Sequence, residues 1–274
     1  MKLLPALTCF IIFIFIVHFS EAQEVFTPAS RSQSLAGISV CLSDAWSAFG
    51  NQAGLAQINR PILGGTFQNR FLLKELSTGS ALFILPVQSS VFAITFYQFG
   101  KTIFRQEKLG ITFAQSLSPK LHAGLQFNYY SFFMPEENQS KGTYGVELGF
   151  QYQLTKNVLM GIHALNPIKT SIKTFSGEYD YPTRYNLGAL IQLSGSFGFM
   201  TEVEKQLLIP EIIIKTGLEY EIMKKLVLRT GLSGKPYQLA AGMGFEVKKL
   251  RIDLAVAYNQ HLGNSPSASF QYQF

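Results

Sequence analysis

The sequence predicts an all-β chain that closes into an antiparallel transmembrane β-barrel of about 14 strands, preceded by a short helical plug segment. Three observations predict this fold. Apolar and polar residues alternate with a period of two as far as the C-terminus, short and long connections alternate between these segments, and charge is scarce. Only 15% of the 274 residues are charged, against about 25% in a typical soluble domain. Because 47% are hydrophobic, the composition excludes a disordered chain.

The alternation is clearest near the C-terminus. In residues 250–259, large apolar side chains alternate with Arg251, Asp253 and small or polar residues. Phe270, Tyr272 and Phe274 share one face of the last segment. Successive side chains of a strand point to opposite faces, so each segment has one apolar and one polar face. The terminal aromatic residues resemble the signal that barrel-assembly machinery recognises in bacterial outer-membrane proteins, which implies that machinery as a partner.

The same pattern, read along the chain, gives the expected strands and connections. The strands lie at about 62–73, 77–86, 90–99, 107–117, 120–132, 142–154, 157–166, 183–193, 196–206, 210–222, 225–232, 237–248, 249–259 and 266–274. The third is unusual because residues 91–99 are apolar on both faces. Short connections at one end and long ones at the other are typical of outer-membrane barrels. An even number of strands places both chain ends on the short-turn, periplasmic side.

Alternation also occurs in soluble β-sandwiches, so the outer face needs separate evidence. The polar face combines glycine, amide and charged residues, which suits a wet lumen, and the apolar face carries tyrosine and phenylalanine near strand ends. In hydrocarbon, unpaired strand edges cost several kcal/mol for each polar group, so the sheet must close on itself. We therefore expect the apolar face to contact lipid in the outer membrane of a Gram-negative-type bacterium, and a soluble β protein is the alternative.

Residues 1–22 have the features of a cleaved signal peptide. Lys2 precedes an apolar run from Leu3 to Phe19, and the segment ends on Ser20-Glu21-Ala22. An uncleaved anchor is the alternative. Cleavage removes Cys9 and leaves Cys41, so the mature chain has no internal disulfide.

Residues 23–60 do not alternate, and residues 61–274 form the expected barrel. Ser43 or Asp44 is positioned to cap a short helix over Ala45 to Phe49. We expect this segment to fold into the barrel mouth as a plug, and a flexible periplasmic arm is the alternative.

The plug segment resembles the N-terminal signature of the FadL-like outer-membrane superfamily, including its PorV/PorQ-type branch. The matching residues are Asp44, Ser47, Ala48, Asn51, Ala53, Gly54, Leu55 and Ala56, whereas Gln52 stands where the family usually has proline. Segments such as Gly217-Leu218-Glu219-Tyr220 and Ile252-Asp253-Leu254-Ala255 are similar to the same branch. The resemblance implies a plugged barrel of fourteen strands.

Charged residues recur in the polar phase of the later strands. Those that the pattern directs into the lumen include Lys215, Glu219, Arg229, Glu246, Arg251 and Asp253. Opposite charges on neighbouring strands can pair across a low-dielectric lumen. We expect a network that holds the lumen together or braces the plug; a polar track for a solute is the alternative. Cations expected in the outer loops, which suit anionic lipopolysaccharide, are Lys101, Arg105, Lys108, Lys141, Lys169, Lys173 and Lys235.

The sequence gives no sign of an enzyme. It contains no nucleophile elbow and no phosphate-binding loop. The histidines, at positions 18, 122, 163 and 261, lack the spacing of metal ligands. There is no basic patch with interleaved aromatic residues, so nucleic acid is not expected. We expect no catalytic residue, no metal and no cofactor.

The resemblance implies two functions of different kinds. The PorV/PorQ-type branch implies an interaction protein linked to type IX secretion or cell-surface attachment, whose partners are secretion-system or exported proteins. The FadL group implies a transporter of hydrophobic small molecules through a plugged barrel with a lateral opening. Because the expected outer loops are compact, the interaction protein is the first expectation and the transporter the alternative.

Overall fold

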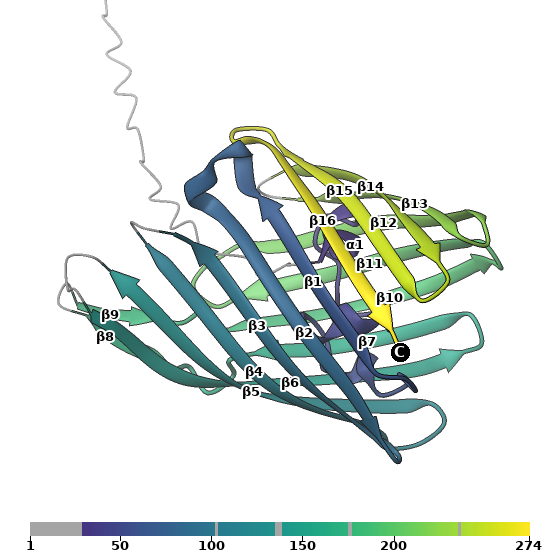
Figure 1. Ribbon diagram of the computed structural model, residues 1–274, viewed down its shortest axis with the longest axis horizontal. Coiled ribbons are helices and arrows are strands. Elements are labelled where there is room, and N and C mark those ends of the chain that lie inside the picture. The colour runs from purple at the N-terminus through teal and green to yellow at the C-terminus, as the bar shows by residue number, and fades with distance from the viewer. Residues whose placement is uncertain (1–28, 102–103, 135–138, 175–176, 235–236) are drawn as a thin grey trace, which may run out of the picture.

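A computed structural model describes residues 29–101, 104–134, 139–174, 177–234 and 237–274. The predicted signal peptide, residues 1–22, lies outside these ranges. Within the described residues no helix is long and apolar enough to cross a membrane. Figure 1 shows a ring of strongly tilted strands, with the N-terminal segment, in purple, enclosed between its walls.

Fourteen antiparallel strands form one closed barrel, which confirms the predicted fold class. Each strand pairs with its neighbours in the chain, and the last pairs with the first. The barrel strands are β1 (Ile62–Asn69), β2 (Ser77–Val87), β3 (Ser90–Gly100), β4 (Arg105–Ser116), β5 (Leu121–Met134), β6 (Gln139–Thr155), β7 (Val158–Leu165), β10 (Arg184–Ser194), β11 (Phe197–Gln206), β12 (Ile212–Met223), β13 (Leu226–Ser233), β14 (Gln238–Val247), β15 (Leu250–Asn259) and β16 (Gly263–Gln273).

Two predicted segments differ from the structure. The connection expected at 167–182 contains a hairpin, β8 (Ser171–Thr174) and β9 (Gly177–Asp180), which forms a separate two-stranded sheet. The first strand ends at Asn69 instead of continuing to residue 73. Phe71 and Leu72 have φ of 54° and 61°, a left-handed backbone that cannot continue a strand. Two short 3₁₀ turns, η3 (Arg70–Leu72) and η4 (Lys74–Leu76), follow instead.

The outer face of the barrel is apolar along every strand. Phe127 on β5, Ile162 on β7 and Val256 on β15 all point outward and are exposed. The residues that alternate with them, such as Asn128 and Asp253, are buried inside. The apolar residues therefore lie on the outer face and the polar residues on the inner face, as the sequence predicts. The outer face suits contact with hydrocarbon.

The barrel closes where β1 meets β16. Gly65 lies opposite Phe270 in the register, and the Phe270 ring covers the space where a side chain of Gly65 would stand. Phe274 donates a backbone hydrogen bond to the Pro61 carbonyl oxygen at 3.0 Å. An aromatic ring over a cross-strand glycine stabilises a sheet at a point where it lacks side-chain packing. The C-terminal aromatic residues thus lie on the outer face at the seam.

The described residues 29–60, here called the plug, lie inside the barrel (Figure 1). They contain the helix α1 (Ser30–Ser34) and two 3₁₀ helices, η1 (Ala45–Phe49) and η2 (Gln52–Leu55). α1 packs against β13 to β16, whereas η2 packs against β4, β5 and β6. β3 is apolar on both faces because its inward side chains Val91 and Ala93 share one hydrophobic core with Trp46 and Phe49 of the plug.

Candidate functional site: the plug and the lumen wall

Asp44 and Ser47 fix the start of η1. Asp44 Oδ1 accepts a hydrogen bond from the backbone N–H of Trp46 at 2.8 Å, and Ser47 Oγ accepts one from the N–H of Asp44. Each side chain thus satisfies a backbone donor that a helix start leaves free. The other carboxylate oxygen of Asp44 binds Arg31 at 2.7 Å. The cap therefore also ties η1 to α1.

Asn51 links the plug to the barrel wall. Its Oδ1 accepts from the N–H of Ala53, and its Nδ2 donates to the carbonyl oxygens of Val40 at 2.8 Å and Phe150 at 3.0 Å. Gly54 is required because a methyl group there would lie 2.3 Å from the carbonyl oxygen of Leu42. Ala53 and Leu55, the other two predicted motif residues, are buried.

Four glycines on the inner wall let the plug backbone approach closely. A methyl group on Gly124 would lie 2.4 Å from the carbonyl carbon of Gln52, and one on Gly161 would lie 2.3 Å from the Val40 oxygen. Gly149 faces the Asn51 side chain and Gly231 faces the Leu35 backbone in the same way. Heavy atoms cannot approach so closely without displacement, so these positions, here called the glycine seat, require the absence of a side chain.

A chain of ion pairs joins the plug to β12, β13 and β15. The Arg31 guanidinium binds Glu219 through two hydrogen bonds of 2.9 and 3.0 Å. Glu219 also accepts from Arg229 at 2.6 Å, and Arg229 in turn binds Asp253 at 2.7 Å. Arg251 extends the chain to Asp253 at 3.2 Å. Burial would lower the pKa of Arg31, but the charges of Glu219 and Asp44 outweigh it, so that pKa lies above its ordinary value.

Lys215 belongs to a second cluster, with Glu202 and Glu204 of β11. Its ammonium lies 2.9 Å from Glu202 and 2.7 Å from Glu204. The other oxygen of Glu202 accepts the backbone N–H groups of Ser39 and Val40 of the plug at 2.8 and 2.9 Å. A buried carboxylate thus holds the middle of the plug by its backbone, a contact that no change of plug side chain removes directly.

Glu147 on β6 is the centre of a third cluster. It binds Lys108 at 2.5 Å, His163 at 3.1 Å and the Gln52 side-chain amide at 2.8 Å. The prediction that Lys108 is an outer-loop cation is wrong, because Lys108 lies on the inward face of β4 and is buried. Gln52 stands where the FadL-like signature usually has proline, and its side chain joins the plug to the barrel wall at Glu147.

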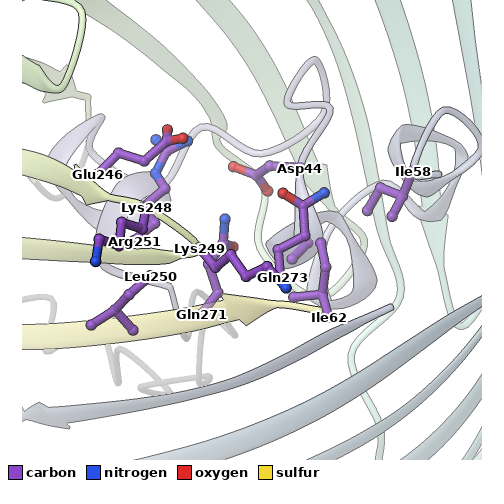
Figure 2. A pocket seen from close by; sticks show the side chains of 11 residues that line it. Asp44, Ile58, Ile62, Glu246, Lys248, Lys249, Leu250, Arg251, Gln271 and Gln273 are labelled. Atoms are coloured by element: carbon purple, nitrogen blue, oxygen red, sulfur yellow. The ribbon is translucent and has the colours of Figure 1, made fainter. Parts of the chain in front are cut away.

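Glu246, the remaining predicted lumen charge, lies at the short-turn end of the barrel. It is exposed and faces Arg251 across β14 and β15. Both residues line a small pocket of about 150 Å³ between the plug and the wall. Figure 2 shows Asp44, Lys249 and Gln273 around the same space. Among the described residues Glu246 has no salt bridge, so the structure brings together four of the six predicted charges and leaves Lys215 and Glu246 apart from them.

On the other side of the lumen a hydrophobic core lies between the plug and the wall, although polar side chains such as Lys108 and His122 are buried on the same strands. One hydrophobic core joins Ile84 and Trp46, toward the short-turn end, to Phe132 and Tyr181, toward the long-loop end. The rings near the long-loop end follow one another: Phe99 lies 6.2 Å from Phe104, Phe104 6.3 Å from Phe132, and Phe132 6.2 Å from Tyr181. We call the members of this core on β2 to β5, together with the apolar face of η1, the aromatic sector. Such separations and tilts are those of favourable aromatic pairs.

The described residues contain no group of three or more histidine, cysteine or acidic side chains able to hold a metal ion. His122 bridges Ser116 and Gln57 by hydrogen bonds of 2.9 and 2.7 Å, and His163 binds Glu147. Both histidines therefore join the plug and wall networks.

Comparison with known proteins gives the fold. No protein-family model and no curated protein sequence matches the chain. Among solved structures, it is similar to the CymD monoaromatic hydrocarbon channel, with a TM-score of 0.72 and 14% identity over 92% of this chain and 99% of that one. The Pseudomonas putida toluene transporter TodX matches with a TM-score of 0.70 and 11% identity over 92% and 98%. A Pseudomonas aeruginosa FadL homologue gives 0.67 and 12% over 91% and 99%.

The chain therefore shares the fold of FadL-type barrels.

Several contacts between the plug and the wall were not predicted from the sequence. Arg31 stands in a segment without periodicity, so its orientation could not be predicted. Glu202, Glu204 and Glu147 lie on the inward face of predicted strands, but the pattern does not identify their partners. The sequence showed only that these acidic residues point into the lumen. A buried acidic residue needs a partner, but the sequence does not say which one.

Proposed function

We propose that the protein is an outer-membrane channel for hydrophobic small molecules, with the aromatic sector as the side of the lumen along which they pass. The observation that carries this proposal is the single apolar core that runs from Ile84 to Tyr181, between the two ends of the barrel. A polar solute would gain nothing from such a surface, whereas an apolar one exchanges water for apolar contacts. The shared fold with hydrocarbon channels supports the same conclusion.

Passage requires the plug to yield on the apolar side. Trp46 and Phe49 of η1 lie in the same core as the wall residues Ile84 and Val91. These contacts are apolar and non-directional, so an apolar solute can replace them in part. On the other side, ion pairs with defined geometry hold α1. A solute therefore meets less resistance beside η1 than beside α1.

An uptake assay tests this function. Expression in a bacterium without its own hydrocarbon channel should raise the initial uptake of a radiolabelled monoaromatic hydrocarbon several-fold, with uptake of a small sugar unchanged. Removal of the Phe132 ring by Phe132→Ala should alter the hydrocarbon rate, and Phe133→Ala on the outer face is the matched control. Equal hydrocarbon uptake with and without the protein would refute the proposal.

Interaction with exported proteins through type IX secretion is the second candidate. It rests on the resemblance to the PorV/PorQ-type branch and on short connections at the long-loop end, such as 260–262 between β15 and β16. Deletion of the gene followed by proteomics of secreted and surface fractions tests it. Loss of specific exported proteins would favour this function, and loss of growth on hydrophobic substrates would favour transport.

We place the protein in the outer membrane of a Gram-negative-type bacterium. Support comes from the apolar outer face and from the fold of its structural neighbours. The C-terminus lies at the short-turn end, where we expect the periplasm, whereas the true N-terminus lies outside the described residues. Barrel-assembly machinery, reached through Phe270, Tyr272 and Phe274, remains a predicted partner, as does lipopolysaccharide near the loop cations other than Lys108; of these cations, Lys235 lies outside the described residues.

A further inference from the structure

Tyr181 occupies a corner of the lumen that has the shape of an aromatic binding site. Its ring stacks on Tyr130 with 3.8 Å between centroids and an interplanar angle of 25°. It also meets the Phe132 ring in a T-shaped contact at 6.2 Å and 72°. One stacked partner and one edge partner are the two arrangements that an aromatic guest prefers. Tyr181, Tyr130 and Phe132 are each at most 2% exposed.

The ring of Tyr181 does not come from the barrel wall. Tyr130 and Phe132 are inward residues of β5, whereas Tyr181 belongs to the long connection between β7 and β10. The side chain of Ile172, from the β8–β9 hairpin of the same connection, is buried in the same core. The wall thus provides the two surfaces of the corner, and an inserted segment provides the ring that fills it.

The backbone of Tyr181 is held independently of its ring. Its carbonyl oxygen accepts from Asn166 Nδ2 at 3.0 Å, and its N–H donates to the Thr170 carbonyl at 2.9 Å. Thr183 Oγ donates to the Asn166 carbonyl at 2.7 Å, which closes the base of the connection. The ring can therefore be removed or displaced without loss of the hydrogen bonds that hold the base of the connection.

A partly exposed aromatic ring adjoins the corner. Phe104, which is 36% exposed, contacts Phe132 at 6.3 Å. Toward the lumen interior, the same face of β5 continues with Asn128, which binds the buried Glu147 at 2.9 Å. An apolar guest therefore meets rings on the outer side before it meets polar groups on the inner side, so the corner is where it would bind first.

We propose that this corner is a binding site for a single planar aromatic ring, and that Tyr181 occupies it as a built-in substitute for the ligand. The proposal rests on the proposed channel function and names the class of solute. A transported ring would stack on Tyr130 after displacing Tyr181. Because Tyr181 competes for the site, the apparent affinity of the wild-type protein for the ligand is reduced by the fraction of time that the ring is seated.

Ligand binding by Tyr181 variants of the full chain tests the proposal. Tyr181→Ala removes the ring and leaves an apolar space of the kind that stays dry and binds benzene. Purified in detergent micelles, this variant should bind benzene about tenfold more tightly than the wild type, or better, as measured by the rise in unfolding temperature with benzene concentration. Cyclohexane, which cannot stack, should bind more weakly than benzene.

Two further variants keep the result interpretable. Tyr181→Phe retains the ring and should bind benzene no better than the wild type. Tyr181→Leu removes the stacking ring but retains apolar volume, so it guards against a failure of the alanine variant to fold and should also bind more tightly. Tyr185→Ala, on the outer face of β10, is the matched control and should leave benzene binding unchanged. Equal benzene binding by the folded alanine or leucine variant and the wild type would overturn the proposal.

The experiment also separates this proposal from the proposed function. Uptake of hydrocarbon without improved benzene binding by the variants would leave the channel function standing and remove the Tyr181 site. Improved binding by the variants without any hydrocarbon uptake would keep the site and remove the channel function.

Discussion

The two sides of the lumen hold the plug by different physical means. On the side of β11 to β15, an ion pair joins Arg31 to Glu219, and the backbone N–H groups of Ser39 and Val40 donate hydrogen bonds to Glu202. On the aromatic sector, Trp46 and Phe49 pack among apolar side chains. Ion pairs fix direction and register, whereas apolar packing fixes only volume and proximity. The difference indicates that the charged side fixes the position of the plug, whereas the contacts of the aromatic sector impose no direction on it.

The largest expected effect comes from Arg229 on the charged side. Its side chain is fully buried between Glu219 and Asp253. Arg229→Ala leaves two carboxylates without their shared partner, which should lower the free energy of unfolding by about 3–5 kcal/mol. Urea unfolding in lipid vesicles measures this change, and limited proteolysis should show faster cleavage within residues 29–60. Unchanged melting together with unchanged protease resistance would contradict the view that this network braces the plug.

Trp46 makes the corresponding test on the aromatic sector. Trp46→Ala removes a large buried side chain and should lower the free energy of unfolding by about 3 kcal/mol, the lower end of the usual range for such a change. The indole N–H has no hydrogen-bond partner among the described residues, so its removal also relieves an unsatisfied donor. Added salt should leave this loss unchanged. A salt-dependent loss would show that the two sides of the lumen are not as distinct as the structure indicates.

The glycine seat gives an intermediate effect with a chemical readout. Gly161→Val places carbon atoms against the Val40 carbonyl and near the Cys41 thiol, and such overpacking should cost about 1–3 kcal/mol. In the wild type, burial and the nearby Glu202 charge raise the pKa of Cys41 from 9.0 to about 12, so the thiol stays protonated and unreactive at pH 8.

Maleimide labelling of Cys41 follows the plug in this variant. Labelling of the Gly161→Val protein should be faster at pH 8 than labelling of the wild type, and Gly195→Val, at an open turn, is the control. Because the folded-state pKa is raised, the stabilisation by the neutral thiol is complete below about pH 9 and decreases as the pH rises toward 12. Equal labelling rates in both proteins would mean that the plug tolerates a side chain at position 161.

The smallest effect is expected at the end of the charged network. Among the described residues Arg251, which is partly exposed, makes one ion pair, at 3.2 Å with Asp253, and Asp253 keeps its stronger partner Arg229. Arg251→Ala should therefore change the free energy of unfolding by less than about 1 kcal/mol. The same urea titration that measures Arg229→Ala decides this. An equal loss in the two variants would place the strength of the network at the lumen surface instead of at its buried centre.

The sequence predicted the barrel well because the period of two determines both the existence and the orientation of a strand. Even residues 91–99, apolar on both faces, form β3, and their inner face is apolar because it packs on the plug. The hairpin β8–β9 was missed because each of its strands has only four residues, too few for a period to show.

The candidate site was less predictable, because the alternation along a strand shows which face a side chain lies on but not which residue it contacts. Glu219 and Arg229 lie opposite each other on neighbouring strands, so their pairing followed from the order of strands, whereas Arg229 reaches Asp253 across β14. Glu202 and Glu147 bind backbone and amide groups of the plug, more than 90 residues away in the chain. Such contacts depend on the path of a segment without periodicity, which no strand pattern specifies.

The pairing of β1 with β16 has a consequence for the timing of folding. The wall closes only when the last strand arrives, and α1 contacts this strand as well as β13 to β15, including a hydrogen bond between Ser30 and Ser267 across 237 positions of sequence. Contacts this distant in the chain form late. A copy that lacks its last strand has unpaired strand edges and has lost the contacts of α1 with β16. A single truncation therefore exposes both the strand edges and part of the N-terminal segment, so proteases should cleave an incomplete chain faster than a complete one.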